Sequence, residues 1–183
     1  MKRLLAALLL VSVALVAPAV ADHFQSPTER LARWAGCKAP VHTSDAVSVL
    51  ESFYAPEDSV WGGYERGLYI GTRKDTPAYV GLMVTLHEVG HCLQHQTGTL
   101  DEMDTVTREL DADRYAADLA CGLGLDGRSL LHELFVWAFQ VYGYDGDENH
   151  GTMVQRIHAG DRASRCDLPP AQAPFRARVL RLP

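Results

Sequence analysis

The sequence predicts an α+β protein that is mostly helical, with a small β-sheet, in a single domain. Three observations favour this class. Several stretches open on a helix-capping residue and close on glycine. A short apolar run bounded by glycines is typical of a strand. The composition, with 47% hydrophobic and 22% charged residues among 183, is that of a globular protein and excludes a disordered chain, a collagen and a multi-span membrane protein.

Capping residues and glycine stops predict six helices along the chain. We expect them at residues 27–35, 44–53, 77–96, 105–121, 130–142 and 153–160. The residues that open the last four are Thr76, Asp104, Ser129 and Thr152. The helix over residues 130–142 is apolar on most faces, which predicts that it is buried.

The apolar run Leu-Tyr-Ile at residues 68–70 lies between two glycines and predicts a strand. An extended peptide could pair with this strand, because strand addition is a common way to bind peptides. Residues 56–63 are expected to form a turn region, and residues 144–151 an acidic, glycine-containing loop.

The first 21 residues are predicted to be a secretory signal peptide. A short basic start precedes an apolar run over residues 4–17, and residues 19–21 (Ala-Val-Ala) have the small-x-small pattern of a cleavage site. A membrane anchor is the alternative, because the run approaches the roughly 18–20 residues that span a bilayer, but Pro18 and the cleavage pattern interrupt it. We therefore expect an exported protein, periplasmic or extracellular, without a stable membrane span after cleavage, whose single domain is residues 22–183.

The charge balance of the exported chain is acidic. Removal of Lys2 and Arg3 with the signal peptide leaves 15 basic and 23 acidic residues, so the formal net charge changes from -6 to -8. This balance argues against a nucleic-acid-binding protein, which would be expected to show a basic patch.

Four cysteines in an oxidising compartment predict two disulfides. Three pairings are open. We favour Cys37 with Cys166, which would tie the two ends of the domain, and Cys92 with Cys121, which would tie two helices. Free buried thiols are the alternative. No C-x-x-C pair is present, so a cysteine-type zinc site is not indicated.

Residues 87–91 read His-Glu-Val-Gly-His on the longest predicted helix. Residues four apart share a helix face, so His87 and His91 can direct imidazole nitrogens at one ion. The Glu88 carboxylate can reach a water molecule on the same metal without displacing a histidine. This is the H-E-x-x-H arrangement of zinc hydrolases. A pair of surface histidines is the alternative, but the apolar run before the motif predicts a buried helix, whose polar groups need compensation that a metal supplies.

Two carboxylates on the next predicted helix can complete the site. A catalytic zinc needs three protein ligands and an open fourth position. Glu109 follows His91 by eighteen residues, and Asp113 lies one turn further on. One of these carboxylates can bind the metal while the other orients a ligand histidine. We favour Glu109 as a ligand over the alternative, a solvated charge beside Arg108.

The remaining histidines are expected to have other roles. His95 extends the stripe of His87 and His91, but it lies about 12 Å along the helix axis from His87, so the two cannot both bind one ion through bonds near 2 Å. We expect it to act as a helix-end group. Structural roles are expected for His23, His42, His132 and His158.

A third block combines a loop histidine with a capped helix. Hydrolysis through an activated water generates an oxyanion, and donors aimed at it contribute several kcal/mol. His150 and Arg156 are candidate donors, although their spacing alone favours an ordinary loop histidine and a surface arginine. Because the chain is acidic, the arginines near the predicted site stand out, and Arg108 and Arg114 are therefore further candidates for a role there.

The three blocks, in this order, resemble the neutral zinc metallopeptidase family and the related M48-type gluzincin peptidases. They are His87-Glu88-Val89-Gly90-His91 with Gln94, Glu109-Leu110-Asp111-Ala112-Asp113 with Tyr115-Ala116, and His150-Gly151-Thr152 with Gln155-Arg156. The resemblance covers about residues 65–166. It implies a zincin-like fold, with an active-site helix, a second helix that supplies the Glu ligand, and a small sheet whose edge strand binds substrate backbone.

The resemblance also implies roles for seven residues. The zinc ligands would be His87, His91 and Glu109, and Glu88 would be the general base. Asp113 would support a ligand histidine. His150 and Arg156 would stabilise the tetrahedral intermediate. Two positions depart from the families. Arg114 stands where the neutral zinc family has Cys, and Gly151 stands where the M48-type family has Pro.

We therefore expect a secreted or periplasmic zinc-dependent metalloendopeptidase that hydrolyses peptide or protein substrates. A catalytically silent, zinc-stabilised binding domain on a peptidase scaffold is the alternative. The joint presence of Glu88, Glu109 and His150 argues against it, because a binding domain needs no base. A structural domain with coincidental histidines is a third hypothesis.

Overall fold

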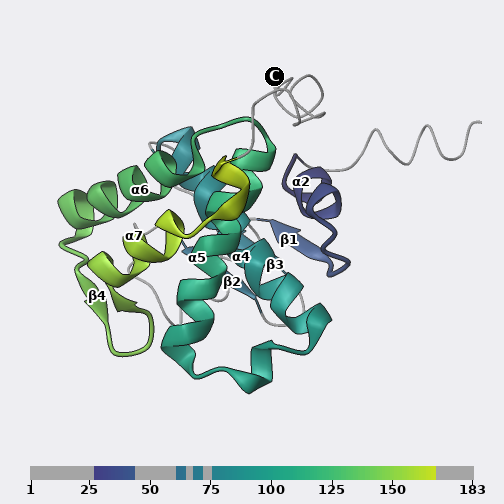
Figure 1. Cartoon of the computed structure of the whole chain (residues 1–183). Helices are drawn as coiled ribbons and strands as arrows, with labels where there is room; N and C mark the ends of the chain where they lie inside the picture. Colours follow the sequence, from purple (N-terminus) through teal and green to yellow (C-terminus); the bar gives the residue numbers. More distant parts are fainter. Residues whose placement is uncertain (1–26, 44–60, 65–67, 72–75, 168–183) are drawn as a thin grey trace, which may run out of the picture.

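Most of the described chain is helical, with a small sheet beside the helices (Figure 1). The computed structural model describes residues 27–43, 61–64, 68–71 and 76–167. The predicted signal peptide and the predicted helix over residues 44–53 lie outside these residues. None of the described helices combines the length and apolar character needed to cross a membrane. The expected mostly helical α+β class is confirmed.

The elements follow one another in a simple order. They are α2 (Pro27–Ala35), β1 (Val41–Thr43), β2 (Trp61–Tyr64), β3 (Leu68–Gly71), α4 (Ala78–Thr97), the 3-10 turn η2 (Leu100–Glu102), α5 (Thr105–Gly122), α6 (Gly127–Tyr142), β4 (Gly146–Asp147), β5 (Gly151–Thr152), α7 (Met153–Asp161) and the 3-10 turn η3 (Ser164–Asp167).

Helix α4 is the central element of the fold. It packs against both the sheet and α5, and half of its 20 residues are buried. Gln94 near its end bonds to Arg108 near the start of α5, whereas His87 contacts Asp113 further along α5, so the two helices run antiparallel as expected. Gly90 permits this approach, since a Cβ there would lie 3.0 Å from the Ala112 Cα atom. The missing side chain brings the carboxylates of α5 within reach of the histidines.

Two helix starts differ from the expectation by a few residues or in their capping group, and a third agrees with it. Helix α4 begins at Ala78, with Pro77 as an N-cap that makes no side-chain cap bond. Helix α6 is capped by Asp126, whose carboxylate accepts from the Ser129 N–H, so Ser129 lies inside the first turn. Asp104 caps α5 as predicted, and its side chain accepts from the Thr107 N–H.

The sheet corrects two expectations. Residues 61–63 were expected in a turn region but belong to strand β2. The strand order is β1-β3-β2, with β1 parallel and β2 antiparallel to β3. The predicted strand at residues 68–70 is therefore central, and both of its edges are already paired. A peptide cannot add to it, so the expected strand addition there is wrong, and β1 and β2 are the outer strands among those described.

The segment between α6 and α7 contains a short hairpin instead of a loop. Strands β4 and β5 pair antiparallel, Gly146 opposite Thr152 and Asp147 opposite Gly151. Gly151 has a φ of +79°. Proline fixes φ near −65°, so a proline at this position could not adopt this conformation.

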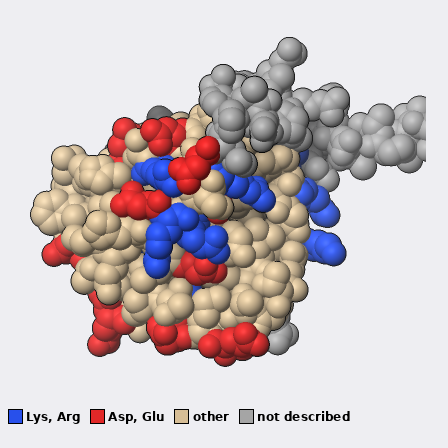
Figure 2. Space-filling view, in the orientation of Figure 1, with Lys and Arg blue, Asp and Glu red and all other residues tan. Residues whose placement is uncertain are grey.

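The expected burial of α6 holds only in its first half. Leu131 and Phe135 are buried, but Phe139 is 50% and Val141 47% exposed. Helix α6 packs on α5, α7 and α4. On the face seen in Figure 2, basic side chains lie among acidic ones and do not form a continuous basic patch.

Both expected disulfides are present, but the favoured pairing is wrong. Cys37 is bonded to Cys92 and Cys121 to Cys166. The reason is local packing: α2 contacts α4, and η3 contacts α5, so each bridge ties a short peripheral element to the neighbouring long helix. Two disulfides fit an exported chain, since oxidising compartments retain them.

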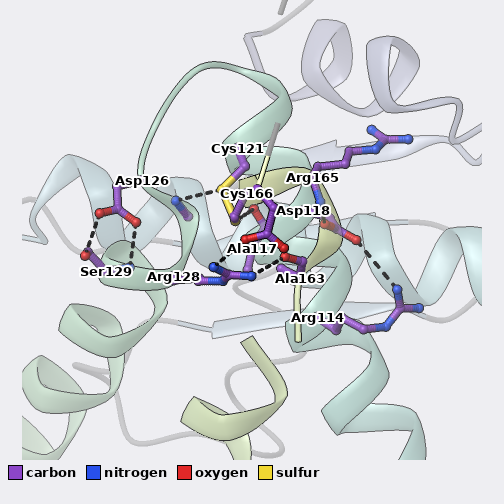
Figure 3. Close-up of a disulfide and its surroundings, with 12 residues drawn as sticks. Arg114, Ala117, Asp118, Cys121, Asp126, Arg128, Ser129, Ala163, Arg165 and Cys166 are labelled. Atoms are coloured by element: carbon purple, nitrogen blue, oxygen red, sulfur yellow. Dashed lines mark hydrogen bonds and ion pairs between the residues drawn. A yellow bond between two sulfur atoms is a disulfide. The ribbon is translucent and has the colours of Figure 1, made fainter. Parts of the chain in front are cut away.

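The second disulfide lies in a polar network that fixes the end of the described chain (Figure 3). Arg128 donates to the Ala163 carbonyl at 2.7 Å and pairs with Asp167 at 3.0 Å. The Asp118 carboxylate accepts from the Arg165 N–H at 2.6 Å. These contacts attach the segment after α7 to α5 and α6, and so hold α7 in place.

Replacing Thr152 by alanine is expected to lower the free energy of unfolding by about 1 kcal/mol. Thr152 forms a capping box with Gln155: its hydroxyl accepts from the Gln155 N–H, and the Gln155 side chain accepts from the Thr152 N–H. Urea unfolding measures the loss. Thr152→Ser keeps the hydroxyl and is expected to retain most of the stability, and equal losses in both variants would contradict the role of the cap.

Candidate metal centre

Three side-chain atoms from α4 and α5 converge on one point. The Nε2 atoms of His87 and His91 are 3.1 Å apart. Glu109 Oε2 lies 3.1 Å from His87 Nε2, and Glu109 Oε1 lies 3.2 Å from His91 Nε2. These three residues form the one group among the described residues whose ligand atoms could hold a metal ion. The predicted ligand triad is thus brought together.

The hydrogen bonds of Gln94 determine which nitrogen of His91 carries the proton. Gln94 is fully buried. Its Nε2 donates to the Arg108 carbonyl at 2.9 Å and to Asp111 Oδ2 at 3.1 Å, both of which only accept. The amide oxygen therefore faces His91 Nδ1, at 2.9 Å. His91 must donate from Nδ1, and in the neutral ring its Nε2 presents a lone pair to the centre.

Asp113 fixes His87 in the same way. His87 Nδ1 donates to Asp113 Oδ1 at 2.9 Å. Arg156 binds the same carboxylate in bidentate fashion, Nε to Oδ2 at 2.7 Å and Nη2 to Oδ1 at 2.9 Å. Although burial opposes ionisation of Asp113, the Arg156 charge and the His87 hydrogen bond outweigh it and hold its pKa below the usual value. His87 Nε2 is consequently the nitrogen that faces His91 and Glu109.

The donor set fits a divalent metal such as zinc. Two imidazole lone pairs and a carboxylate oxygen repel one another at 3.1–3.2 Å unless a cation lies among them. Ligands in tetrahedral positions about 2.0 Å from zinc lie roughly 3.3 Å apart, which matches these separations. Burial raises the pKa of Glu109, but its hydrogen bonds to both histidines outweigh this effect and lower it well below the usual range. Glu109 therefore offers an ionised carboxylate to a metal ion.

Without a metal, a proton takes the place of the cation. Burial works against the charged ring of His87, but the hydrogen bonds and charges of Asp113 and Glu109 outweigh it and raise the pKa of His87 to about 10. A metal bound at this group would displace the proton, as expected for a histidine ligand.

Glu88 has the surroundings of a base rather than of a ligand. It is 5% exposed, and its Oε2 is buried without a hydrogen-bond partner among the described residues. Burial raises the pKa of its carboxyl group, opposed by the charges of His87 and His91. An unsatisfied carboxylate oxygen is costly to bury, and this one lies beside the possible metal site, where it is left for a partner from outside the described chain.

The centre opens into a cavity of about 580 Å³. His87, Glu88, His91 and Glu109 line it on one side. Apolar side chains from α4 and α6 line much of the rest, among them Val80, Val84, Leu134 and Trp137. The cavity thus combines a cluster of ionisable groups with a mostly apolar lining.

His150 lines this cavity from the β4–β5 hairpin. It is half-exposed, and its Nδ1 contacts the Asp147 carboxylate at 2.8 Å. The carboxylate also accepts the His150 N–H at 2.9 Å and the Asn149 N–H at 2.8 Å. Because Asp147 takes Nδ1–H, the Nε2 atom remains for a ligand in the cavity.

Arg156 is buried, and its guanidinium group already forms hydrogen bonds with other residues. Besides Asp113, its Nη1 donates to the Tyr144 hydroxyl at 3.3 Å, and its guanidinium lies 4.7 Å from the centre of the Phe135 ring. It lines the cavity but supports the His87–Asp113 contact from behind. Direct contact with an oxyanion remains a prediction.

Other residues singled out in the sequence have different positions. His95 is exposed in the last turn of α4 and is not one of the grouped ligands. Arg114 pairs with Asp111 at 2.6 Å and with Asp118 at 3.6 Å, and it does not line the cavity. Arg108 does line it. Sequence reasoning gave no role to Gln94, although its polar side chain three residues after His91 on a buried helix was a usable signal.

Replacing Gln94 by leucine is expected to weaken zinc affinity by roughly 10–100-fold, because His91 loses the partner that fixes its ring and tautomer. Competition with a zinc-binding dye measures the affinity. Gln96→Leu is the matched control, since Gln96 is exposed and bonds to the backbone of Gly36 and Lys38 instead. Equal zinc affinities of the Gln94 variant and the wild type would contradict the positioning role.

Comparison of the chain with protein-family models, with curated proteins and with solved structures gives no match.

Proposed function

We propose that this protein is an exported zinc metallopeptidase with a zincin-like fold of the gluzincin type. The observation that supports it most is the combination of the triad His87, His91 and Glu109 with the unpartnered Glu88 oxygen in one cavity. A purely structural zinc site is closed by four protein ligands, whereas a catalytic site keeps one position open. Three ligands, a free base and a substrate-sized cavity together favour catalysis.

His87, His91 and Glu109 would hold the metal. When bound, zinc supplies a Lewis acid that lowers the pKa of a water molecule toward about 7 and polarises a carbonyl group. Glu88 accepts the proton of the attacking water and delivers it to the leaving amine. Its buried position, which raises its pKa, makes it a better base than an exposed carboxylate.

The surrounding residues orient these groups. Asp113 and Gln94 hold the two histidine rings with Nε2 toward the centre. Arg156 keeps Asp113 ionised and in place. His150, anchored through Asp147, lies in the cavity wall, and a ring protonated on both nitrogens would donate from Nε2 to the oxyanion that develops on the substrate.

A quenched casein assay with the purified protein tests the proposal. We expect hydrolysis that stops when a chelator is added and returns when zinc is restored. A protein that binds zinc but turns over none of a varied set of peptides would contradict the peptidase and favour a zinc-stabilised binding domain.

A further inference from the structure

Arg108 occupies a distinctive place beside the proposed metal centre. It directly precedes the ligand Glu109 in α5 and lines the same cavity. Its backbone is fixed, because the Arg108 carbonyl accepts from Gln94 Nε2 at 2.9 Å. The same glutamine orients His91. The base of the Arg108 side chain is thus held in a constant position relative to the metal ligands.

The guanidinium of Arg108 lacks an acidic partner. Its Nη2 donates to the Thr105 hydroxyl at 3.2 Å, and its Nε is buried without an acceptor among the described residues. No carboxylate of the described chain lies within ion-pair distance of it, whereas Arg156, the other arginine in the cavity wall, is bound bidentately by Asp113. Among the described residues that line this cavity, Arg108 is therefore the one arginine whose charge is not paired with a carboxylate.

The chemistry of such a group favours a carboxylate ligand. Guanidinium presents five N–H donors in a planar fork that matches a carboxylate and is always charged. Charge-assisted bonds of this type are about twice as strong as neutral ones. They are strengthened further in surroundings of low polarity, and apolar side chains, among them Val84, Leu100 and Trp137, line this cavity.

We propose that Arg108 forms a carboxylate-binding subsite that selects peptides with an acidic group close to the scissile bond. This inference rests on the proposed peptidase function. The carboxylate is either the C-terminal α-carboxylate of the peptide or the side chain of an Asp or Glu residue. Arg108 is then a specificity-determining residue, whereas Glu88 acts on every substrate.

Competition between matched peptides tests the proposal. Each peptide sequence is supplied in four versions, with a free or amidated C-terminus and with Glu or Gln near the cleavage site. For one of the two kinds of carboxylate, the wild type is expected to cleave the acid version with a kcat/KM about ten-fold or more above that of its neutral counterpart. The terminal and side-chain pairs show which carboxylate is recognised. Arg108→Gln is expected to reduce the preference to less than two-fold, and Arg108→Lys to an intermediate value.

Arg162→Gln is the matched control, because Arg162 is exposed, lies outside this cavity and carries the same charge. It is expected to keep the wild-type preference. Absence of a carboxylate preference in the wild type, or its persistence in Arg108→Gln with normal zinc content, would overturn the subsite while leaving the peptidase intact.

If no peptide is cleaved, the proposed peptidase function is overturned. The carboxylate subsite can then still be tested by a binding measurement. Fluorescence anisotropy of the same labelled peptides with the zinc-loaded protein is then expected to show about ten-fold tighter binding of the acid versions, lost in Arg108→Gln. Equal binding of acid and amide versions would overturn the subsite.

Discussion

Glu88→Gln is expected to lose peptide hydrolysis by on the order of 10²–10⁴-fold while retaining zinc. Glutamine has nearly the same shape as glutamate but cannot accept the proton of the attacking water. The three metal ligands are separate residues, and they keep their contacts to Asp113, Gln94 and one another. The change therefore removes the base and not the metal site.

The measurement combines kcat/KM on a cleaved peptide with the zinc content of the same preparation. Glu133→Gln is the matched control, because Glu133 is exposed on α6 and is expected to leave both quantities unchanged. Full peptidase activity in Glu88→Gln would sink the proposed mechanism. Loss of zinc together with activity would instead show that Glu88 helps to build the metal site.

Arg156→Met is expected to lower the free energy of unfolding by about 3–5 kcal/mol, because it leaves the Asp113 carboxylate buried beside His87 without its cation. Asp113 is fully buried and receives two of its hydrogen bonds from Arg156. The Arg156 guanidinium also packs on Phe135.

Urea unfolding of the zinc-loaded protein at a fixed zinc concentration measures this loss. Arg162→Met serves as the control, since Arg162 is exposed at the end of α7. The double variant Asp113→Asn with Arg156→Met is expected to be less destabilised than Arg156→Met alone, because no unpaired charge remains. A single variant within 1 kcal/mol of the wild type would refute the buried network.

The sequence predicted the site better than it predicted the periphery of the fold. The positions of His87 and His91 on one face follow from the helical repeat, which is a local property. Glu109 and Asp113 became predictable once a short connection made the next helix return antiparallel. The proximity of Arg156 depends on how α7 packs across α5, which spacing alone did not reveal.

Several features depend on contacts between distant elements and were missed or misassigned. The cysteine pairing follows from the docking of α2 on α4 and of η3 on α5, so a preference for joining the chain ends was misleading. Strand β2 has the glycine-rich sequence Trp-Gly-Gly-Tyr, which suggested a turn. The need for glycine at position 90 becomes visible only when Ala112 is placed against it.

The metal content of the purified protein tests the central claim most directly. We expect about one equivalent of zinc per chain by elemental analysis, and much less in Glu109→Gln, because Glu109 bridges the two ligand histidines. Glu102→Gln, at an exposed position in η2, should retain the full equivalent. Less than about half an equivalent in the wild type, with no gain after zinc is added, would contradict a metal centre formed by His87, His91 and Glu109.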